Sequence, residues 1–539
     1  MADVVTLVAP PEMFPILPGS GLAPGGAAVV GNKAWNLMRM VQAGLPVPAA
    51  FVLPTSWCGH THGTARLAPV LAQGIALLET ATSLSFGGLS RPLLVSVRSG
   101  AAVSMPGMME TVLDVGLNDI TVEALIRQTG NPRLGWDSYR RLVQAYADVV
   151  AGLPTAPFDA LLAAALVRAE AETEQDLDHR DLRSLTRAML DCYRDRAGQA
   201  FPDDPMTQLL NATQAVLRSW NAEKAASYRR LNAIDDDAGT AVTVQTMVFG
   251  NAGGSSGAGV GFTRNPATGE HAFYFDFQFD GQGEDVVAGR QKLPDHERLS
   301  RALPAVWTRL AEICPTLEAL FGDAQDFEFT VQSGELFLLQ ARRAKRTDWA
   351  ALVIAVDRVA EGALTPKAAL AQIEGIDLDS VARTRFAPPV PPPLATALVA
   401  SLGVASGAIA LDPAAVLRLV AAGTPAILVR RDTVTSDIEG MAQAAGILTG
   451  SGGRTSHAAI VARQLGKVCL VACPGLEIDI ERRQCRIGST ILDEGDLLAL
   501  DGNTGAVFPG SLAILTERPD AALAAIAAWK AAAPPIKPG

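Results

Sequence analysis

Gly452-Gly453-Arg454-Thr455-Ser456-His457-Ala458-Ala459-Ile460-Val461-Ala462-Arg463 has the pattern of a flexible turn that leads into a helix. Thr455 and Ser456 are favourable helix caps, and Gly466 can end the helix. His457 is then expected in the first turn. There the helix dipole favours a neutral imidazole that can attack phosphorus, and it favours the phosphate once attached. A histidine that merely caps a packed helix is the alternative.

A compact α/β module is expected around this segment, from residue 396 to 510. Apolar runs at 426–429, 446–448 and 468–471 predict its strands. The preceding run Ala387-Pro388-Pro389-Val390-Pro391-Pro392-Pro393 should be extended and semi-rigid, so it marks a linker. Residues 511–539 predict an alanine-rich helix and a loose, proline-containing end.

The part of the chain before the proline run divides by its pattern. Residues 1–345 form one predicted domain, with a helical insert at about 120–235 and a strand-rich part at 241–345. Residues 346–395 form a helical and proline-rich linker. Residues 93–97 predict a strand that leads into a loop at 98–109. The expected fold class is therefore multidomain, with α/β and α+β parts.

Composition limits the function classes. The chain has 539 residues with a net charge of −11 and a pI near 5.2, which argues against bulk nucleic-acid binding. Six cysteines are thinly spread. Cys469 and Cys473 suggest a metal pair, but we favour buried thiols in a reducing compartment. Neither a signal peptide nor a membrane span is expected, so the cytoplasm is the expected location.

The hairpin at 326–342 carries the second candidate site. Strand periodicity puts Asp326 and Glu328 on one face, and Gln340 and Arg342 on one face of the return strand. A two-residue turn would separate these pairs, whereas a three-residue loop with Gly334 left-handed unites them. We predict the three-residue loop, because it also gathers the hairpin's apolar residues on the other face. These are Phe327, Phe329, Val331, Phe337 and Leu339.

Two carboxylates beside an amide and a guanidinium suit Mg²⁺ with a polyphosphate. A surface salt-bridge cluster is the alternative. Lys33 is either a surface lysine or a phosphate ligand, and Arg98 is a candidate anion ligand at a strand end. The glycine-rich segment 253–259 is either a phosphate lid or an ordinary hairpin loop.

Together these segments resemble the pyruvate phosphate dikinase family of phosphoenolpyruvate-utilising enzymes. The resemblance runs from about residue 20 to 510. Besides the hairpin and 452–463, the matching runs are 97–109, 136–141, 244–251, 261–270, 281–289 and 436–441. It implies an ATP-grasp nucleotide-binding domain followed by a swivelling phosphohistidine domain.

The resemblance also implies residue roles. Lys33, Arg98, Gln340 and Arg342 would bind ATP, Asp326 and Glu328 would hold Mg²⁺, and His457 would carry the phosphoryl group. The 98–109 loop, with Ser104, Met105 and Gly107, would lie over the phosphates. In the family, ATP passes its β-phosphoryl group to the histidine, the γ-phosphoryl group goes to inorganic phosphate, and AMP and pyrophosphate leave. Phosphorylation of Thr455 would repel that transfer, although a capping role is favoured.

The sequence departs from the family in two places. Gly31-Asn32 replaces a glycine pair, and only residues 511–539 follow Gly510, whereas the family's pyruvate site lies in a (β/α)₈ barrel of about 250 residues. We therefore expect the final acceptor on a separate protein, or a small molecule other than pyruvate. A catalytically silent nucleotide-binding regulator and a fragment of a complete dikinase are the alternatives. No nucleic-acid or membrane partner is expected.

Overall fold

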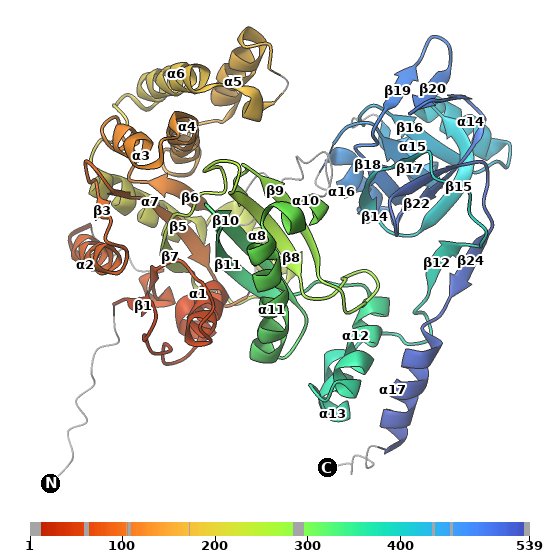
Figure 1. Cartoon of the computed structure of the whole chain (residues 1–539), viewed down its shortest axis with the longest axis horizontal. Coiled ribbons are helices and arrows are strands. Elements are labelled where there is room, and N and C mark those ends of the chain that lie inside the picture. The colour runs from red at the N-terminus through yellow and green to blue at the C-terminus, as the bar shows by residue number, and fades with distance from the viewer. Residues whose placement is uncertain are drawn as a thin grey trace. The chain divides into compact units, whose positions relative to one another are not determined.

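The computed structural model describes residues 12–58, 64–103, 105, 109–171, 173–283, 296–433, 437–452 and 456–532. The chain forms two compact units. The first holds residues 1–258 with 327–342, and the second holds residues 259–326 with 343–539. Both contain helices and sheets (Figure 1), so the expected mixture of α and β structure is confirmed.

The first unit is built on a five-stranded sheet in the order β1-β2-β7-β5-β6, and all neighbouring strands are antiparallel. Its central strands are almost wholly buried because short apolar runs such as Ala50–Leu53 pack on both faces. The strands are β1 (Phe14–Ile16), β2 (Ala50–Leu53), β5 (Val95–Gly100), β6 (Thr111–Val115) and β7 (Ala241–Thr246), and β3 (Ser85–Phe86) pairs separately with β4 (Pro92–Leu93).

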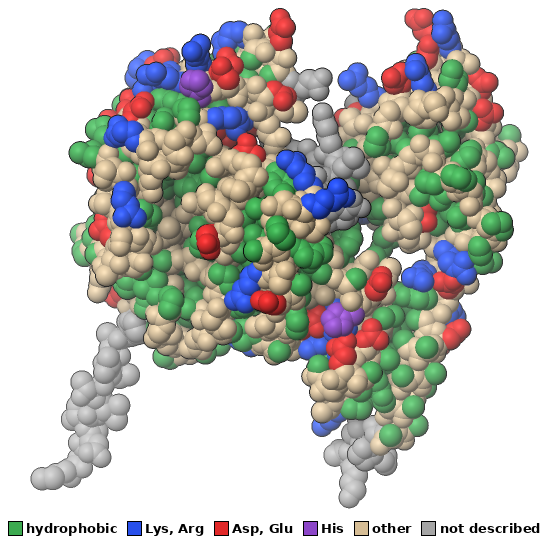
Figure 2. Space-filling view, viewed as in Figure 1, with side chains coloured by type: hydrophobic (Ala, Val, Ile, Leu, Met, Phe, Trp, Pro, Cys, Tyr) green, Lys and Arg blue, Asp and Glu red, His purple; other side chains and the backbone are tan. Residues whose placement is uncertain are grey.

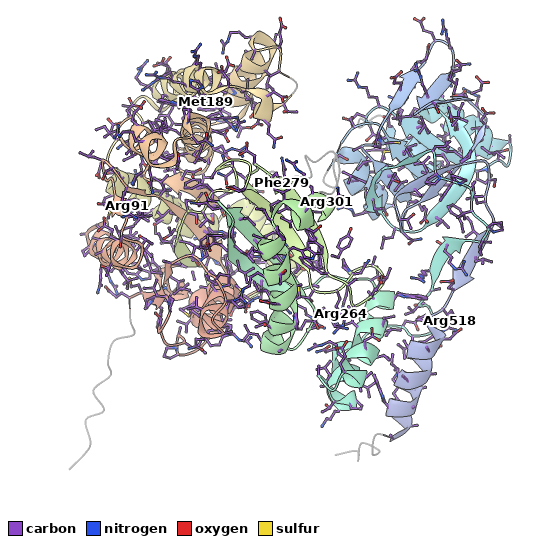
Figure 3. All side chains as sticks on the ribbon, in the orientation of Figure 1. Arg91, Met189, Arg264, Phe279, Arg301 and Arg518 are labelled. Atoms are coloured by element: carbon purple, nitrogen blue, oxygen red, sulfur yellow. The ribbon has the colours of Figure 1, made fainter. Side chains whose placement is uncertain are left out.

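Helices cover this sheet; α3 to α8 lie in the region predicted to be helical, whereas α1 and α2 precede it. Asn131 caps α4 by accepting a hydrogen bond from the amide of Leu134, and left-handed Gly198 ends α6. Met189, labelled in Figure 3, is fully buried in this core. The helices are α1 (Ala27–Gln42), α2 (Thr64–Thr82), α3 (Thr121–Thr129), α4 (Pro132–Val149), α5 (Ala156–Arg168), α6 (His179–Ala197), α7 (Pro205–Ser219) and α8 (Glu223–Leu231).

A four-stranded sheet in the order β11-β10-β8-β9 contains the predicted hairpin. At the described residues, two helices come between β9 and β10 in the chain. The elements are β8 (Gly257–Phe262), β9 (Tyr274–Phe279), α10 (His296–Ala302), α11 (Pro304–Phe321), β10 (Gln325–Gln332) and β11 (Glu335–Arg343).

The predicted hairpin turn is wrong. β10 ends at Gln332 and β11 begins at Glu335, so the turn has two residues, and both Ser333 and Gly334 have positive φ (51° and 85°). This is the type I′ geometry that matches the twist of paired strands. Accordingly, Leu336 and Leu338 are buried, whereas Phe337 and Leu339, which we expected in the core, are only partly buried.

Burial along β11 then slips by one residue. After Leu336 and Leu338 the next buried position is Ala341, and Gln340 and Arg342 are both partly exposed. The prediction assumed strict alternation of burial along this strand. It therefore used a three-residue turn to place Gln340 and Arg342 on the same face as Asp326 and Glu328.

The α/β module, residues 396–510, contains most of an eight-stranded sheet in the order β13-β23-β22-β15-β16-β17-β18-β14. Its four central strands, β15 to β18, are parallel. Apolar side chains fill both faces of this sheet, as parallel strands require. The elements are β13 (Ala395–Thr396), β14 (Leu398–Ser401), β15 (Val404–Ala410), α14 (Pro413–Ala421), β16 (Ala426–Arg430), α15 (Ile438–Gln443), β17 (Gly446–Thr449), α16 (His457–Gln464), β18 (Val468–Val471), β22 (Leu497–Asp501) and β23 (Ala506–Pro509), and a separate sheet of β19 (Leu476–Asp479), β20 (Gln484–Ile487) and β21 (Thr490–Asp493).

The segments on either side of the α/β module pair with each other. β12 (Arg383–Phe386) and β24 (Ile514–Glu517) form an antiparallel ribbon, in which Glu517 binds both Arg383 and Arg385. The tail helix α17 (Asp520–Ala532) packs through Ala522 and Ile526 against α12 (Asp348–Ala360) and α13 (Pro366–Gln372). The sequence analysis predicted the tail helix but neither strand of the ribbon.

Among the described residues, every helix is too short or too polar to cross a membrane. On the face shown in Figure 2, acidic and basic side chains are interspersed over the helical part of the first unit.

Candidate functional site

A close backbone contact positions Lys33. Helix α1 is interrupted at Gly31, whose φ of 72° and ψ of 155° are not helical. A Cβ atom at Gly31 would lie 1.9 Å from the carbonyl oxygen of Gly100, so only glycine fits here. The Asn32 amide donates a hydrogen bond of 2.9 Å to the carbonyl of Ala101. This contact brings the segment that carries Lys33 against the end of β5.

Arg98 lies on β5, where its cross-strand partners are Thr243 and Thr111. Its guanidinium group reaches the hairpin, at 3.4 Å from both Glu328 Oε2 and the carbonyl oxygen of Leu339. Both distances are long for charge-assisted hydrogen bonds, so the ion pair is loose. The side chains are only 14% and 21% exposed, so solvent screens the pair weakly.

The electrostatic surroundings of Lys33 are unusual. Burial, Arg98 and Arg342 together lower the pKa of Lys33 to about 7, although Glu328 acts in the opposite direction. Three cationic side chains thus converge with one carboxylate in the first unit. Such an arrangement has a deficit of negative charge that a polyphosphate would supply.

The two hairpin carboxylates suit a cation that also binds phosphate. Asp326 is buried, and Glu328 is partly exposed two residues along the same strand. Mg²⁺ usually takes one or two carboxylates and completes its octahedron with water and phosphate oxygens. In the described part of the chain no group of three metal-binding side chains occurs. The residues therefore fit Mg²⁺ that is held jointly with a nucleotide.

The alternative metal pair does not fit. Cys469 and Cys473 are buried free thiols, and burial raises the pKa of each to about 12. Cys469 packs in one apolar cluster and Cys473 in another, so the two thiols are packing residues.

The segment after Arg98 is described at Ala101–Val103, Met105 and from Met109 onward; Ser104 and Gly107 lie outside the described residues. The Met105 side chain is 7% exposed and packs with Trp220 and Ala225. The glycine-rich segment 253–256 contacts the hairpin turn, because Gly334 donates to the carbonyl of Ser255 and Ser333 donates to Ser256 Oγ. Because these hydrogen bonds hold the glycine-rich segment against the hairpin turn, they favour an ordinary loop there rather than a phosphate lid.

His457 is the first residue of α16, which follows β17 and precedes β18. Ser456 caps the helix by accepting a hydrogen bond from the Ala459 amide, and Gly466 follows the helix end, as predicted. The residue thus lies at a helix N-terminus beyond the carboxyl end of a parallel strand, where α/β sheets bind ligands. Its side chain and Thr455 lie outside the description.

Several side chains support the first unit's site without a recognisable sequence signal. Asn36 Nδ2 on α1 donates 2.9 Å to the carbonyl of Ala341 on β11. In α4, Asp137 binds Arg140 at 2.8 Å and Arg141 at 3.0 Å. Burial opposes ionisation of Asp137, but these two arginines outweigh it and hold the pKa of the carboxyl well below its usual range. Residues 136–141 are one of the runs that resemble the family, but their spacing does not predict these buried ion pairs.

Comparison with known proteins supports both a nucleotide-binding part of the chain and a separate α/β module at residues 396–510. Residues 71–308 match the family described as "Pyruvate phosphate dikinase, AMP/ATP-binding domain", and residues 423–505 match "PEP-utilising enzyme, mobile domain". The class is therefore that of the phosphoenolpyruvate-utilising phosphotransferases. Within this class, the chain contains the AMP/ATP-binding domain of pyruvate phosphate dikinases and the mobile domain, and it is similar to pyruvate, phosphate dikinases over about 90% of its own length.

Individual relatives give the same result. The pyruvate, phosphate dikinase of Clostridium symbiosum is 41% identical over 493 residues, which is 90% of this chain and 56% of that protein. The enzyme of Giardia intestinalis is 41% identical over 494 residues, with the same coverage. The chloroplastic enzyme of Flaveria pringlei is 40% identical over 491 residues, 90% of this chain and 51% of the relative. The chain spans about half the length of the curated relatives it matches.

Proposed function

We propose that this chain uses ATP and inorganic phosphate to phosphorylate His457. The α/β module, residues 396–510, would then act as a carrier domain that delivers the phosphoryl group to an acceptor. In the first reaction the β-phosphoryl group of ATP forms a bond to the imidazole and the γ-phosphoryl group passes to phosphate. AMP and pyrophosphate leave. The observation that carries the proposal is the convergence of Lys33, Arg98 and Arg342 around Glu328 in the first unit.

The chemistry of these residues supports the roles we assign. Phosphoryl transfer depends mainly on positioning and on neutralising charge on the phosphate oxygens. Lys33, Arg98, Gln340 and Arg342 would bind the polyphosphate. Asp326 and Glu328 would hold Mg²⁺, which when bound would neutralise charge on the phosphate groups. Glu328 would also exchange its loose contact with Arg98 for that cation.

The carrier step rests on how the chain enters and leaves the carrier domain. Both connections run through the single β12–β24 ribbon, and the segment 387–393 has neither helix nor strand. We infer that residues 396–510 move as one body on this ribbon. A neutral His457 at the N-terminus of α16 would be a competent nucleophile, and the helix dipole would stabilise its phosphorylated form.

The proposal is tested by incubating the protein with Mg²⁺ and ATP labelled at the β-phosphate, with and without inorganic phosphate. We expect acid-labile label on the wild-type protein and none on His457→Ala. Release of AMP and pyrophosphate should require phosphate. A protein that binds ATP but never becomes labelled would contradict the proposal and support the silent regulator.

The acceptor is a further proposal, namely pyruvate, or another small molecule, at a site supplied by a separate protein. Labelled protein would be separated from nucleotide and mixed with pyruvate alone, with pyruvate and a barrel domain from a relative, and with small alcohols and phenols. Loss of label that requires the barrel domain would support a two-protein dikinase. Loss to pyruvate alone would contradict the separate site.

A further inference from the structure

We propose that Trp220 is a positioning residue. Trp220 and helix α8 pack against Met105 and thereby anchor the segment between β5 and β6, which follows Arg98. This anchoring holds the segment beside Lys33. The catalytic consequence rests on the proposed function, whereas the anchoring itself does not. All the residues that carry the argument belong to the first unit.

The anchor is an apolar cluster that is separate from the main core. Ala101, Met105, Trp220 and Ala225 are at most 7% exposed and pack together, with Met109 and Tyr228 against them. The segment between β5 and β6 has no helix or strand at its described residues. Its position therefore depends on side-chain contacts of this kind rather than on a backbone ladder.

Trp220 is itself held rigidly. Its indole Nε1 donates 3.0 Å to the carbonyl of Asp236, and the Arg229 guanidinium lies 4.2 Å from its ring centroid. Arg229 also binds the Asp236 carboxylate at 2.7 Å and donates to the carbonyl of Trp220. These contacts fix one edge and one face of the ring, so Met105 packs in a cluster with a side chain that cannot easily move.

A polar clamp fixes the far end of the same segment. Lys224 on α8 binds Glu110 at 2.6 Å, and the Glu110 amide donates 3.4 Å to Ser219 Oγ. The near end is fixed to the candidate site, because the carbonyl of Ala101 accepts from the Asn32 amide next to Lys33. The segment is thus held at three points, and two of them come from the Ser219–Arg229 region.

This arrangement gives α8 a role in positioning the segment after β5. An apolar cluster that contributed only stability would have no such role. Loosening the Met105 contact frees the middle of a segment whose start contacts the backbone beside Lys33. Groups that must surround a reacting phosphate lose rate steeply when they are misplaced by about 1 Å. A structural core elsewhere in the unit would affect only stability.

The test compares Met105→Ala with Met189→Ala, which removes the same side chain from the fully buried core between helices α4 and α6 (Figure 3). Hydrogen exchange of residues 101–110 is measured without nucleotide. We expect exchange in Met105→Ala to be about tenfold faster or more, since truncating a buried methionine opens its surroundings. Met189→Ala should leave this segment unchanged. Equal exchange in the two variants would overturn the proposal.

The second readout is the single-turnover rate of His457 labelling beside equilibrium binding of ATP. Met105→Ala should label about tenfold more slowly, with ATP affinity changed less than about threefold. Trp220→Phe, which keeps a ring but loses the indole hydrogen bond, should lie between it and the wild type, and it serves if Met105→Ala does not fold. Labelling rates that merely follow thermal stability across all variants would contradict positioning. If the wild type does not label, the proposed function fails, and the exchange experiment still decides the anchor.

Discussion

Binding of nucleotide to the first unit should take up a proton, because Lys33 is poised to gain one. Its pKa is lowered to about 7 by burial and by Arg98 and Arg342. A bound polyphosphate replaces this repulsion with attraction, so the pKa in the complex should return to about 10.4 or higher. At pH 8 a group with a pKa of about 7 is about 90% deprotonated, so binding should take up about 0.9 proton.

The same linkage fixes the sign of the pH dependence. Since binding takes up a proton above pH 7, affinity should fall as pH rises. From pH 7 to pH 9 the protonated fraction falls from about one half to about one hundredth, so affinity should fall about 50-fold. The assay is calorimetric titration with a non-hydrolysable ATP analogue and Mg²⁺, in buffers of different ionisation enthalpy.

Lys33→Arg is the matched control, because it keeps the charge but cannot titrate in this range. Its proton uptake at pH 8 should be close to zero, and its affinity should change little between pH 7 and pH 9. Uptake near zero in the wild type, or equal uptake in the wild type and in Lys33→Arg, would refute the assignment of Lys33 as a phosphate ligand with a lowered pKa.

Three further changes test the supporting structure. Gly31→Ala should abolish nucleotide binding, measured by the same titration, because its Cβ would meet the Gly100 carbonyl; normal binding would contradict the close approach. Asp137→Asn should lower the free energy of unfolding by about 1.5–3 kcal/mol in urea denaturation, since Arg140 and Arg141 lose one charge partner and keep Glu174, and a loss below about 0.5 kcal/mol would show the Asp137 contacts to be dispensable. Ser456→Ala should cost about 0.5–2 kcal/mol through the lost helix cap, seen in thermal unfolding; an unchanged midpoint would contradict the cap.

Local signals in the sequence predicted much of this structure. The strand at 468–471 and the helix after Ser456 follow from an apolar run and from a cap, which are properties of a few adjacent residues. The prediction of a three-residue hairpin turn was wrong because it assumed strict alternation along β11. Burial along this strand shifts by one residue after Leu338, and no spacing in the sequence shows that shift. The type I′ turn requires positive φ at Ser333, which sequence preference alone does not demand.

Features that depend on distant contacts were not predictable. Residues 514–517 are a strand only because residues 383–386 pair with them, and Arg383 and Arg385 share Glu517 across that ribbon. Likewise, Met105 lies in a loop with no periodic pattern, and its burial depends on Trp220 far along the chain. The lowered pKa of Lys33 also arises from residues on three separate segments. Tertiary context decides all three.

The central claim is that His457 receives the phosphoryl group, and peptide mapping of the phosphorylated protein tests it most directly. Protein reacted with ATP, Mg²⁺ and phosphate would be digested under neutral conditions, which preserve phosphohistidine, beside a His457→Asn control. The account predicts one phosphoryl mass shift on the peptide that contains His457, absent from the control. A shift on any other peptide, or one that persists in His457→Asn, would contradict it.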